Sequence, residues 1–316
     1  MIDFSKIKTN STRNRINTVT VSSLYDPEQH MSSGWIAEGF DELCDRILEA
    51  RKNKRPIIFS FGAHVIKKGL SRYLIALIKN GYITHLVGNG ACSIHDFELC
   101  YLGGTSEHVP TAIEDGSFGM WEETGAWMND AIQYGAKNGL GYGESLALYM
   151  DSHLSRFPYT DICVLYQAWR LNVPSTYHIA LGTDIIHQHP TVDFGAIGAT
   201  SGVDFKRLCE SVSDLEGGVF LNFGSGVIGP EVFLKALSIV RNLGYPVRKL
   251  TTANFDLRPV HDVYGVKSLN DPDYYYRPIK NVVCRPNSLG GKGWHFCGDH
   301  VVTIHALYEK LYHARV

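Results

Sequence analysis

Two histidines, His64 and His95, are the first candidates for chemistry in this sequence. Each lies close after an apolar run that breaks into small residues, Gly62-Ala63 in one case and residues 88–91 (GNGA) in the other. An imidazole titrates near neutral pH, so either side chain could act as a general base. The alternative is that both only form hydrogen bonds with phosphate or backbone groups. His95 and its neighbour Asp96 form the pair to substitute first.

Both loops belong to one predicted strand–helix–strand unit. Residues 56–61 and 83–87 are mainly apolar, as expected of parallel strands that are buried on both faces. Residues 70–78 have helical spacing of leucine and isoleucine, and Asn80-Gly81 marks the helix end. Parallel strands place both loops at one edge of a sheet, where helix amino termini and free backbone N–H groups can bind phosphate or carboxylate. Neither loop is GxGxxG or a Walker A motif, so a nucleotide, a sugar phosphate and no cofactor all stay open.

The same alternation of strands and helices continues along the chain. It predicts an α/β fold: a doubly wound, mostly parallel, Rossmann-like sheet with helices on both faces. Residues 1–33 are polar and form a predicted arm that either extends freely or packs on a partner subunit, while residues 34–316 form a single domain. Further strands are expected at 175–180, 217–223, 247–253 and 281–285, and helices at 35–52, 96–101, 120–137, 143–157, 162–171, 204–214, 230–243 and 301–312.

Composition narrows the class of protein. The 316 residues are 44% hydrophobic and carry a formal net charge of −2, which argues against a nucleic-acid partner because phosphate binding needs a concentrated basic face. No apolar run reaches the length of a membrane span, and the amino terminus lacks an apolar signal core. The seven cysteines contain no CxxC pair, so a disulfide framework or zinc ribbon is not expected. A reducing cytoplasm is the expected location.

Five loop motifs occur in a fixed order, and together they resemble those of the deoxyhypusine synthase family. The resemblance runs from about residue 56 to the carboxyl terminus. Any one motif would be weak, but the ordered set is specific. The matching segments are residues 62–70 (the family's TSNLISSGL-like loop), 88–96 (TTAGGxEED), 181–184 (ALTDGS), 223–227 (LGGGV) and 252–253 (the TA of NTAxEFDGSDSG).

The resemblance implies a Rossmann-like subunit that binds NAD. It also implies a dimer with active sites at the subunit interface, and two such dimers in a tetramer. The family oxidises a polyamine carbon with NAD, moves the aminobutyl imine to a lysine and reduces it. For Asp184, the functional role is a carboxylate that binds ribose or a substrate ammonium, and the alternative is a helix cap. The residues implied to bind the cofactor are His64, Val65, Ile66, Asn89, Gly90, Ala91, Asp184, Gly224, Ser225, Gly226, Thr252 and Ala253.

The chain departs from the family at its catalytic positions. Ile94 and His95 stand where the family has two glutamates, and only Asp96 is kept. The family's KHH triplet is replaced by Gly229-Pro230-Glu231. The nucleophile could be Lys292 or Lys280, so the predicted catalytic residues are Lys292, Lys280, His95 and Asp96.

These departures favour a related transfer to or from a small amine or polyamine over hypusine formation itself. A catalytically silent, NAD-binding paralogue with a regulatory role is the alternative. A third hypothesis, metal-assisted hydrolysis, rests on His187 and His189. Histidines two residues apart share a face only in a strand, which this loop is not expected to be, so no metal is predicted.

Overall fold

Six strands form one parallel sheet in the computed structural model, which describes residues 2–29, 34–260, 263, 273 and 275–314. Their order is β5-β3-β2-β6-β7-β8, and every ladder between neighbours is parallel. The chain proceeds outward from β2 in both directions, so the sheet is doubly wound, as predicted. The strands are β2 (Ile57–Phe61), β3 (His85–Asn89), β5 (Ser175–His178), β6 (Val219–Phe223), β7 (Thr251–Asp256) and β8 (Lys292–Cys297).

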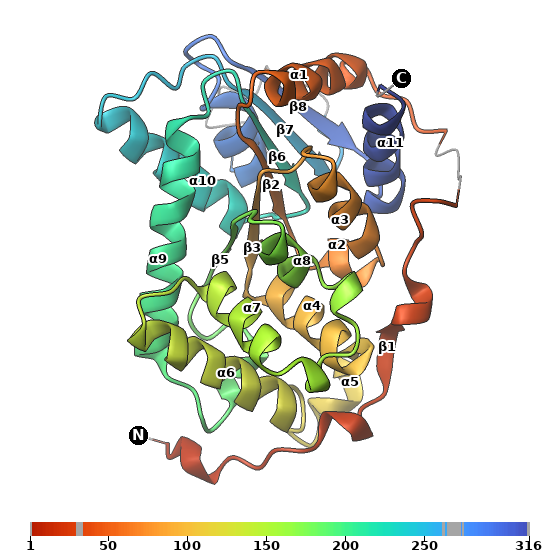
Figure 1. Ribbon diagram of the computed structural model, residues 1–316, viewed down its shortest axis with the longest axis vertical. Coiled ribbons are helices and arrows are strands. Elements are labelled where there is room, and N and C mark those ends of the chain that lie inside the picture. The colour runs from red at the N-terminus through yellow and green to blue at the C-terminus, as the bar shows by residue number, and fades with distance from the viewer. Residues whose placement is uncertain (1, 30–33, 261–262, 264–272, 274, 315–316) are drawn as a thin grey trace.

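Helices cover both faces of this sheet (Figure 1). In that view α9 and α10 lie on one side, and α1, α3 and α11 lie on the other. The helices are α1 (Phe40–Lys52), α2 (His64–Lys67), α3 (Ser71–Lys79), α4 (Gly90–Leu102), α5 (Val109–Ala112), α6 (Glu122–Lys137), α7 (Tyr142–Ser152), α8 (Val164–Arg170), α9 (Phe194–Ser213), α10 (Ile228–Asn242) and α11 (His300–His313).

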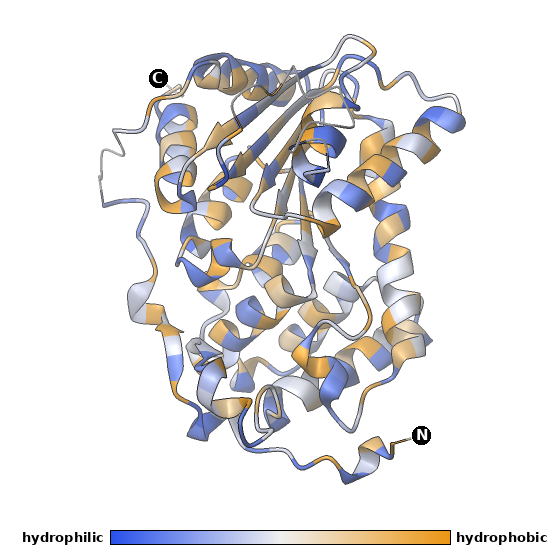
Figure 2. Ribbon diagram, turned by 180° about the vertical axis from the view of Figure 1, so that it is seen from behind, coloured by the Kyte–Doolittle hydropathy of each residue, from blue (hydrophilic) through white to orange (hydrophobic). Residues whose placement is uncertain are grey.

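The central strands are apolar because both of their faces are buried. Every residue of β2 and β6 is buried, and the strands appear as hydrophobic ribbons inside the molecule (Figure 2). Alternate side chains pack into two clusters. Phe59 stacks on Phe223 with ring centres 4.6 Å apart, on the α1 side, whereas Phe220 stacks on Phe233 of α10 at 3.7 Å. Burial of such rings supplies much of the driving force for folding.

The described part of the amino-terminal arm packs along its own chain. Strand β1 (Asn17–Thr20) pairs antiparallel with β4 (Gly104–Glu107), and Figure 1 shows the arm, in red, running along the side of the domain. Arg15 forms two hydrogen bonds with Glu98 of α4, at 2.7 and 2.8 Å, and both side chains are buried. The arm is therefore fastened to the domain by a buried ion pair.

Six predicted elements need correction. Two are helices: the one expected at 35–52 begins later, at Phe40, and the one expected at 143–157 ends earlier, at Ser152. Residues 281–285 are not a strand but part of a π-helix, η7 (Ile279–Cys284), because a short apolar run fits a buried helix as well as a strand. The strand expected at 247–253 begins later, at Thr251, and the helix expected at 96–101 begins earlier, at Gly90. Helix α9 begins at Phe194 rather than at residue 204, with the Asp193 carboxylate capping it through the Ala196 N–H (2.9 Å).

Strand β8 was not predicted. Only Trp294 and Phe296 of its six residues belong to the apolar core, since β8 is an edge strand with one face toward solvent. In the described ranges, no helix combines the length and the apolar character needed to cross a membrane. All seven cysteines are free.

Asp204 of α9 ties three elements together and is fully buried. Its Oδ2 accepts hydrogen bonds from the backbone N–H of Tyr177 (2.8 Å) and of Gly143 (3.1 Å). Burial raises the pKa of this carboxyl from 3.8 to about 7. The folded state therefore keeps a proton that the unfolded chain has released, and this contribution to stability is complete below pH 3.8 and disappears as the pH rises through about 7.

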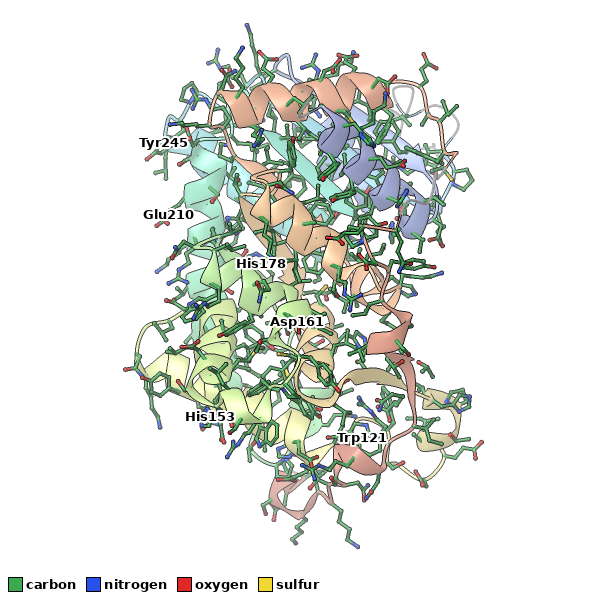
Figure 3. The ribbon with its side chains drawn as sticks, turned by 45° about the vertical axis from the view of Figure 1, so that its right-hand side comes forward. Trp121, His153, Asp161, His178, Glu210 and Tyr245 are labelled. Carbon is green, nitrogen blue, oxygen red and sulfur yellow. The ribbon has the colours of Figure 1, made fainter. Side chains whose placement is uncertain are left out.

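We expect this contribution to be visible in an Asp204→Asn variant. The free energy of unfolding of the wild type, relative to the variant, should fall between pH 4 and 7 by at most about 1.4 kcal/mol per pH unit and stay constant above that range. Urea unfolding at a series of pH values measures the difference. The exposed Asp161→Asn change (Asp161 is labelled in Figure 3) provides the control and should show no such trend. Parallel stability curves for wild type and Asp204→Asn would contradict the expectation.

Candidate active site

Two glycine loops meet at the carboxyl edge of the sheet, where β2 and β6 end. The Gly62 N–H donates to the Phe223 carbonyl (2.9 Å), and a Cβ on Gly62 would lie only 2.5 Å from the Gly224 carbonyl oxygen. Gly224 has φ +68°, a conformation that favours glycine. Strand order reverses between β2 and β6, and ligands of open α/β sheets bind at such a point. The bare backbone of these loops is therefore the natural start of a binding site.

His300 closes the other side of this junction. It is the first residue of α11, and its Nε2 lies 2.3 Å from the position that a Cβ on Gly224 would occupy. Its Nδ1 is buried and finds no hydrogen-bond partner among the described residues. Burial lowers the pKa of His300, against the opposing effect of the Asp256 and Asp299 carboxylates. His300 is thus a neutral imidazole beside the glycine loops.

Sequence reasoning missed His300 because it missed β8, the strand that leads to it. The signal was available, since Gly298-Asp299-His300 follows that strand with the same small-then-polar pattern as Gly62-Ala63-His64. His64, the first residue of α2, does lie at the expected edge. The side chains of Val65 and Ile66 are fully buried in the core, so only their backbone could reach a ligand.

Asp184 lies against the start of α4. A Cβ on Gly90 would fall 1.8 Å from Asp184 Oδ2, so only glycine allows this approach. Asn89 caps the same helix, its Oδ1 accepting from the Cys92 N–H at 3.0 Å, and Ala91 follows Gly90 in the first turn. Asp184 Oδ2 has no hydrogen-bond partner within the described part of the chain, and burial raises the pKa of this carboxyl to about 6. The carboxylate is therefore positioned to accept a hydrogen bond from a ligand.

A chain of buried hydrogen bonds crosses four strands behind the β6 loop. Ser60 donates to Asn222 (3.2 Å), Asn222 donates to Asn254 (2.7 Å), and Asn254 contacts His295 Nδ1 (2.9 Å). These four residues stand side by side in the register of β2, β6, β7 and β8. Asn222 also donates to the carbonyl of Ser225 at 3.0 Å. The chain therefore fixes the turn that contains Gly224, Ser225 and Gly226.

We expect Asn222→Leu to be costly, because the change leaves the Ser225 carbonyl, Asn254 Oδ1 and the Ser60 hydroxyl without this partner. Each buried polar group left unpaired costs about 1–3 kcal/mol, so the total should reach about 3 kcal/mol or more. Ser60→Ala, which removes only the terminal donor, should cost about 1 kcal/mol. Denaturant unfolding of both variants tests the ranking. Equal losses would contradict the role of Asn222 as the central member of the chain.

The other predicted site residues lie in different places. Thr252 and Ala253 are inside β7 rather than in the loop after it. Lys292 begins β8 at the opposite, amino-terminal edge of the sheet, where it pairs with Glu42 and its Nζ lies 5.0 Å from the centre of the Trp294 ring. This edge is opposite to the one at which the glycine loops of the same chain lie. Lys280 lies on the π-helix, with Nζ 5.5 Å from the centre of the Tyr275 ring.

Asp96 and His95 both lie in α4, one turn beyond the loop. Both carboxylate oxygens of Asp96 accept from backbone N–H groups of α8, at 3.0 Å from Val164 and 2.7 Å from Leu165, and burial raises the pKa of Asp96 to about 6. Asp96 therefore holds α8 in place. His95 is half-buried, and its Nδ1 lies 2.7 Å from the Thr105 hydroxyl. Burial lowers the pKa of His95 to about 4.

The two histidines considered for a metal have separate partners. His187 Nδ1 accepts from the backbone N–H of Gly182 (3.1 Å) and of Asp184 (3.2 Å). His189 contacts Thr191 through Nδ1, and its Nε2 lies 3.4 Å from Glu122. The ranges that the structure describes contain no group of three or more His, Cys, Asp or Glu side chains able to hold a metal ion.

Comparison with known proteins shows similarity of fold. No model of a protein family matches the chain, and no curated protein matches it either. Among solved structures, a putative deoxyhypusine synthase from Entamoeba histolytica is similar with a TM-score of 0.52 at 11% identity, over 92% of this chain and 96% of that one.

Two further solved structures are larger than this chain. A putative LOR/SDH protein from Methanococcus maripaludis S2 has a TM-score of 0.53 at 14% identity, over 98% of this chain and 76% of that one. ArgZ, an arginine dihydrolase from the ornithine–ammonia cycle in cyanobacteria, has a TM-score of 0.50 at 16% identity over 88% of this chain. The chain spans 33% of the length of ArgZ. At these identities the structural similarity shows a shared fold alone.

Proposed function

We propose that this chain is an NAD-dependent enzyme of the deoxyhypusine synthase type that acts on a small amine. The observation that carries the proposal is the junction at the carboxyl edge, where Gly62 and Gly224 bring two bare loops into contact beside His64 and His300. The ordered loop motifs and the similarity in fold to a solved structure named as a putative deoxyhypusine synthase support the choice of cofactor and reaction type.

The residues at this edge fit a dinucleotide. The loops at Gly62 and at Gly224–Gly226 would receive the pyrophosphate, and the backbone of Gly226 is open to it, because nothing lies within 4 Å of the position of a Cβ there. Gly62 and Gly224 let the two loops and His300 pack closely against one another. Asp184 Oδ2, buried and without a partner among the described residues, would accept from a donor such as a ribose hydroxyl or a substrate ammonium. A ligand at this position would supply the hydrogen bond that Asp184 Oδ2 lacks in the described part of the chain, where His187 Nε2 lies 3.9 Å away.

When bound, NAD would accept a hydride from the carbon next to the amine nitrogen. The chain itself must hold the amine and take a proton from its nitrogen. His64 and His95 come from α2 and α4, and burial lowers the pKa of His95 to about 4. His95 therefore stays neutral at pH 7 and is free to accept a proton. Lys280 and Lys292 are the two candidate lysines for a later transfer step.

Spectroscopy tests the proposal directly. Purified protein should bind NAD. It should also produce the transient absorbance of NADH when a diamine or polyamine is added. Gly224→Val should abolish the binding, because a side chain at φ +68° is strained and would meet His300. Absence of NAD binding, together with absence of any absorbance change across a panel of di- and polyamines, would contradict the proposal.

A silent NAD-binding paralogue is the second candidate, and two observations favour it. Asp96 is occupied by the backbone of α8, and Lys292 pairs with Glu42 at the far edge of the sheet. A silent protein would bind NAD without turnover of any amine, and replacing Lys280 and Lys292 together by alanine would leave its biological role intact. Cytoplasmic location stays a prediction from composition, and a dimer-of-dimers assembly stays a prediction of the resemblance.

A further inference from the structure

A buried carboxylate, Glu98, lies next to His95 and makes four hydrogen bonds. Arg15 donates to both of its oxygens, at 2.7 and 2.8 Å, and the side chain of Glu98 is only 1% exposed. Thr124 donates to Oε1 at 2.9 Å, and Thr105 donates to Oε2 at 2.5 Å. Each carboxylate oxygen of Glu98 thus accepts two hydrogen bonds, as an ionised carboxylate can.

This arrangement determines what Thr105 can offer His95. A threonine hydroxyl has one proton, and Thr105 gives that proton to Glu98. The contact of 2.7 Å with His95 Nδ1 therefore requires Nδ1 to carry the hydrogen and to donate it to the Thr105 oxygen. A neutral imidazole has one N–H, so Nε2 of His95 is left with its lone pair.

The amino-terminal arm holds this chain of contacts together. Arg15 belongs to the arm, and its guanidinium lies 5.4 Å from the centre of the Trp121 ring; Figure 3 labels Trp121 beside the arm. In the arm's strand β1, Val19 pairs with Thr105 of β4. Arm, carboxylate and threonine thus form one hydrogen-bonded unit that ends at Nδ1 of His95.

We propose that Arg15, Glu98 and Thr105 hold His95 as its Nδ1–H tautomer, so that Nε2 is the atom that accepts a proton from the substrate nitrogen. The inference rests on the function proposed above. In the step, an N–H bond of the substrate breaks and a new Nε2–H bond forms on His95. The electron pair of the broken bond stays on the substrate nitrogen. The negative charge of Glu98, linked to His95 by the Thr105 hydroxyl, stabilises the positive charge that His95 gains. Glu98 and Thr105 are positioning residues, and the arm becomes part of the active site.

Nitrogen-15 NMR of labelled histidines distinguishes the two tautomers and does not depend on turnover. A His95→Gln spectrum assigns the signal. We expect Nδ1–H in the wild type and in Thr105→Ser, which keeps the hydroxyl, and a shift to Nε2–H in Thr105→Val. Thr200→Val removes an equally buried hydroxyl, bonded to Ala196 within α9 at 2.9 Å, and should leave the tautomer unchanged.

The same variants should separate in kinetics. Thr105→Val should lower kcat about 100-fold with KM and NAD affinity unchanged, the range expected for a misoriented general base, while Thr105→Ser restores kcat. An Nε2–H tautomer in the wild type, or equal effects of Thr105→Val and Thr200→Val, would overturn the inference alone. Complete absence of NAD-dependent turnover in the wild type would overturn the proposed function, and with it the catalytic role of Nε2.

Discussion

Gly62→Ala will weaken NAD binding about tenfold or more, a free-energy change of about 1.4 kcal/mol or more. The added Cβ would lie 2.5 Å from the Gly224 carbonyl oxygen and 3.0 Å from its carbon. These are backbone atoms, so the Gly224–Gly226 turn itself must move away, and with it the surface proposed to receive the pyrophosphate. Overpacking of this kind also costs about 1–3 kcal/mol of folding stability. Calorimetric titration with NAD and urea unfolding measure the two effects.

Gly202→Ala is the matched control for this change. Gly202 lies within α9, and no atom is found within 4 Å of the position of its Cβ. Replacing a helical glycine by alanine should stabilise the protein by about 0.5–1 kcal/mol and should leave NAD binding unchanged. A Gly62→Ala protein with wild-type affinity for NAD would show that the two touching loops are not the cofactor site.

Arg15→Met will destabilise the protein by about 3–5 kcal/mol, because it leaves the Glu98 carboxylate buried without its cation. Glu98 lies 83 residues from Arg15 in sequence, and the pair joins the arm to α4. The methionine keeps the apolar stem and removes the charge. Adding Glu98→Gln to Arg15→Met should recover part of the loss, since the unpaired charge is then absent. Denaturant unfolding of the single and double variants measures both values.

An exposed ion pair provides the comparison for Arg15. Arg55 pairs with Asp214 at 2.5 Å, with side chains 42% and 61% exposed. Arg55→Met should change stability by about 0–1 kcal/mol, as surface pairs do. If Arg15→Met cost no more than Arg55→Met, the arm would not be fastened through Glu98, and the proposed control of His95 from the arm would lose its basis.

The centre of the fold could be predicted from the sequence because the central strands are buried on both faces. Such strands are short, continuous apolar runs that end in small residues, and β2, β3 and β6 all have this form. Strand β8 could not be recognised in this way. It is an edge strand whose polar and apolar residues alternate, and the more apolar stretch before it, which includes Val282 and Val283, is a π-helix.

The site could be predicted in part, for the same physical reason. His64, Gly224 and Asp184 follow strands that were recognised, so their loops were assigned to the correct edge, whereas His300 follows the missed strand. A hydrogen-bond network between the central strands could have been predicted from asparagines within buried strands, such as Asn222 and Asn254, since a buried amide must find partners. The pairing of Arg15 with Glu98 had no such signal, because contacts between distant segments depend on tertiary packing.

A crystal structure of the protein soaked with NAD tests the central claim most directly. The account predicts one dinucleotide at the carboxyl edge of the sheet, with its pyrophosphate over the Gly62 and Gly224–Gly226 loops and a donor on Asp184 Oδ2. His95 Nε2 should face the nicotinamide end. A dinucleotide bound at another edge of the sheet, or crystals that stay free of NAD at saturating concentration, would contradict it.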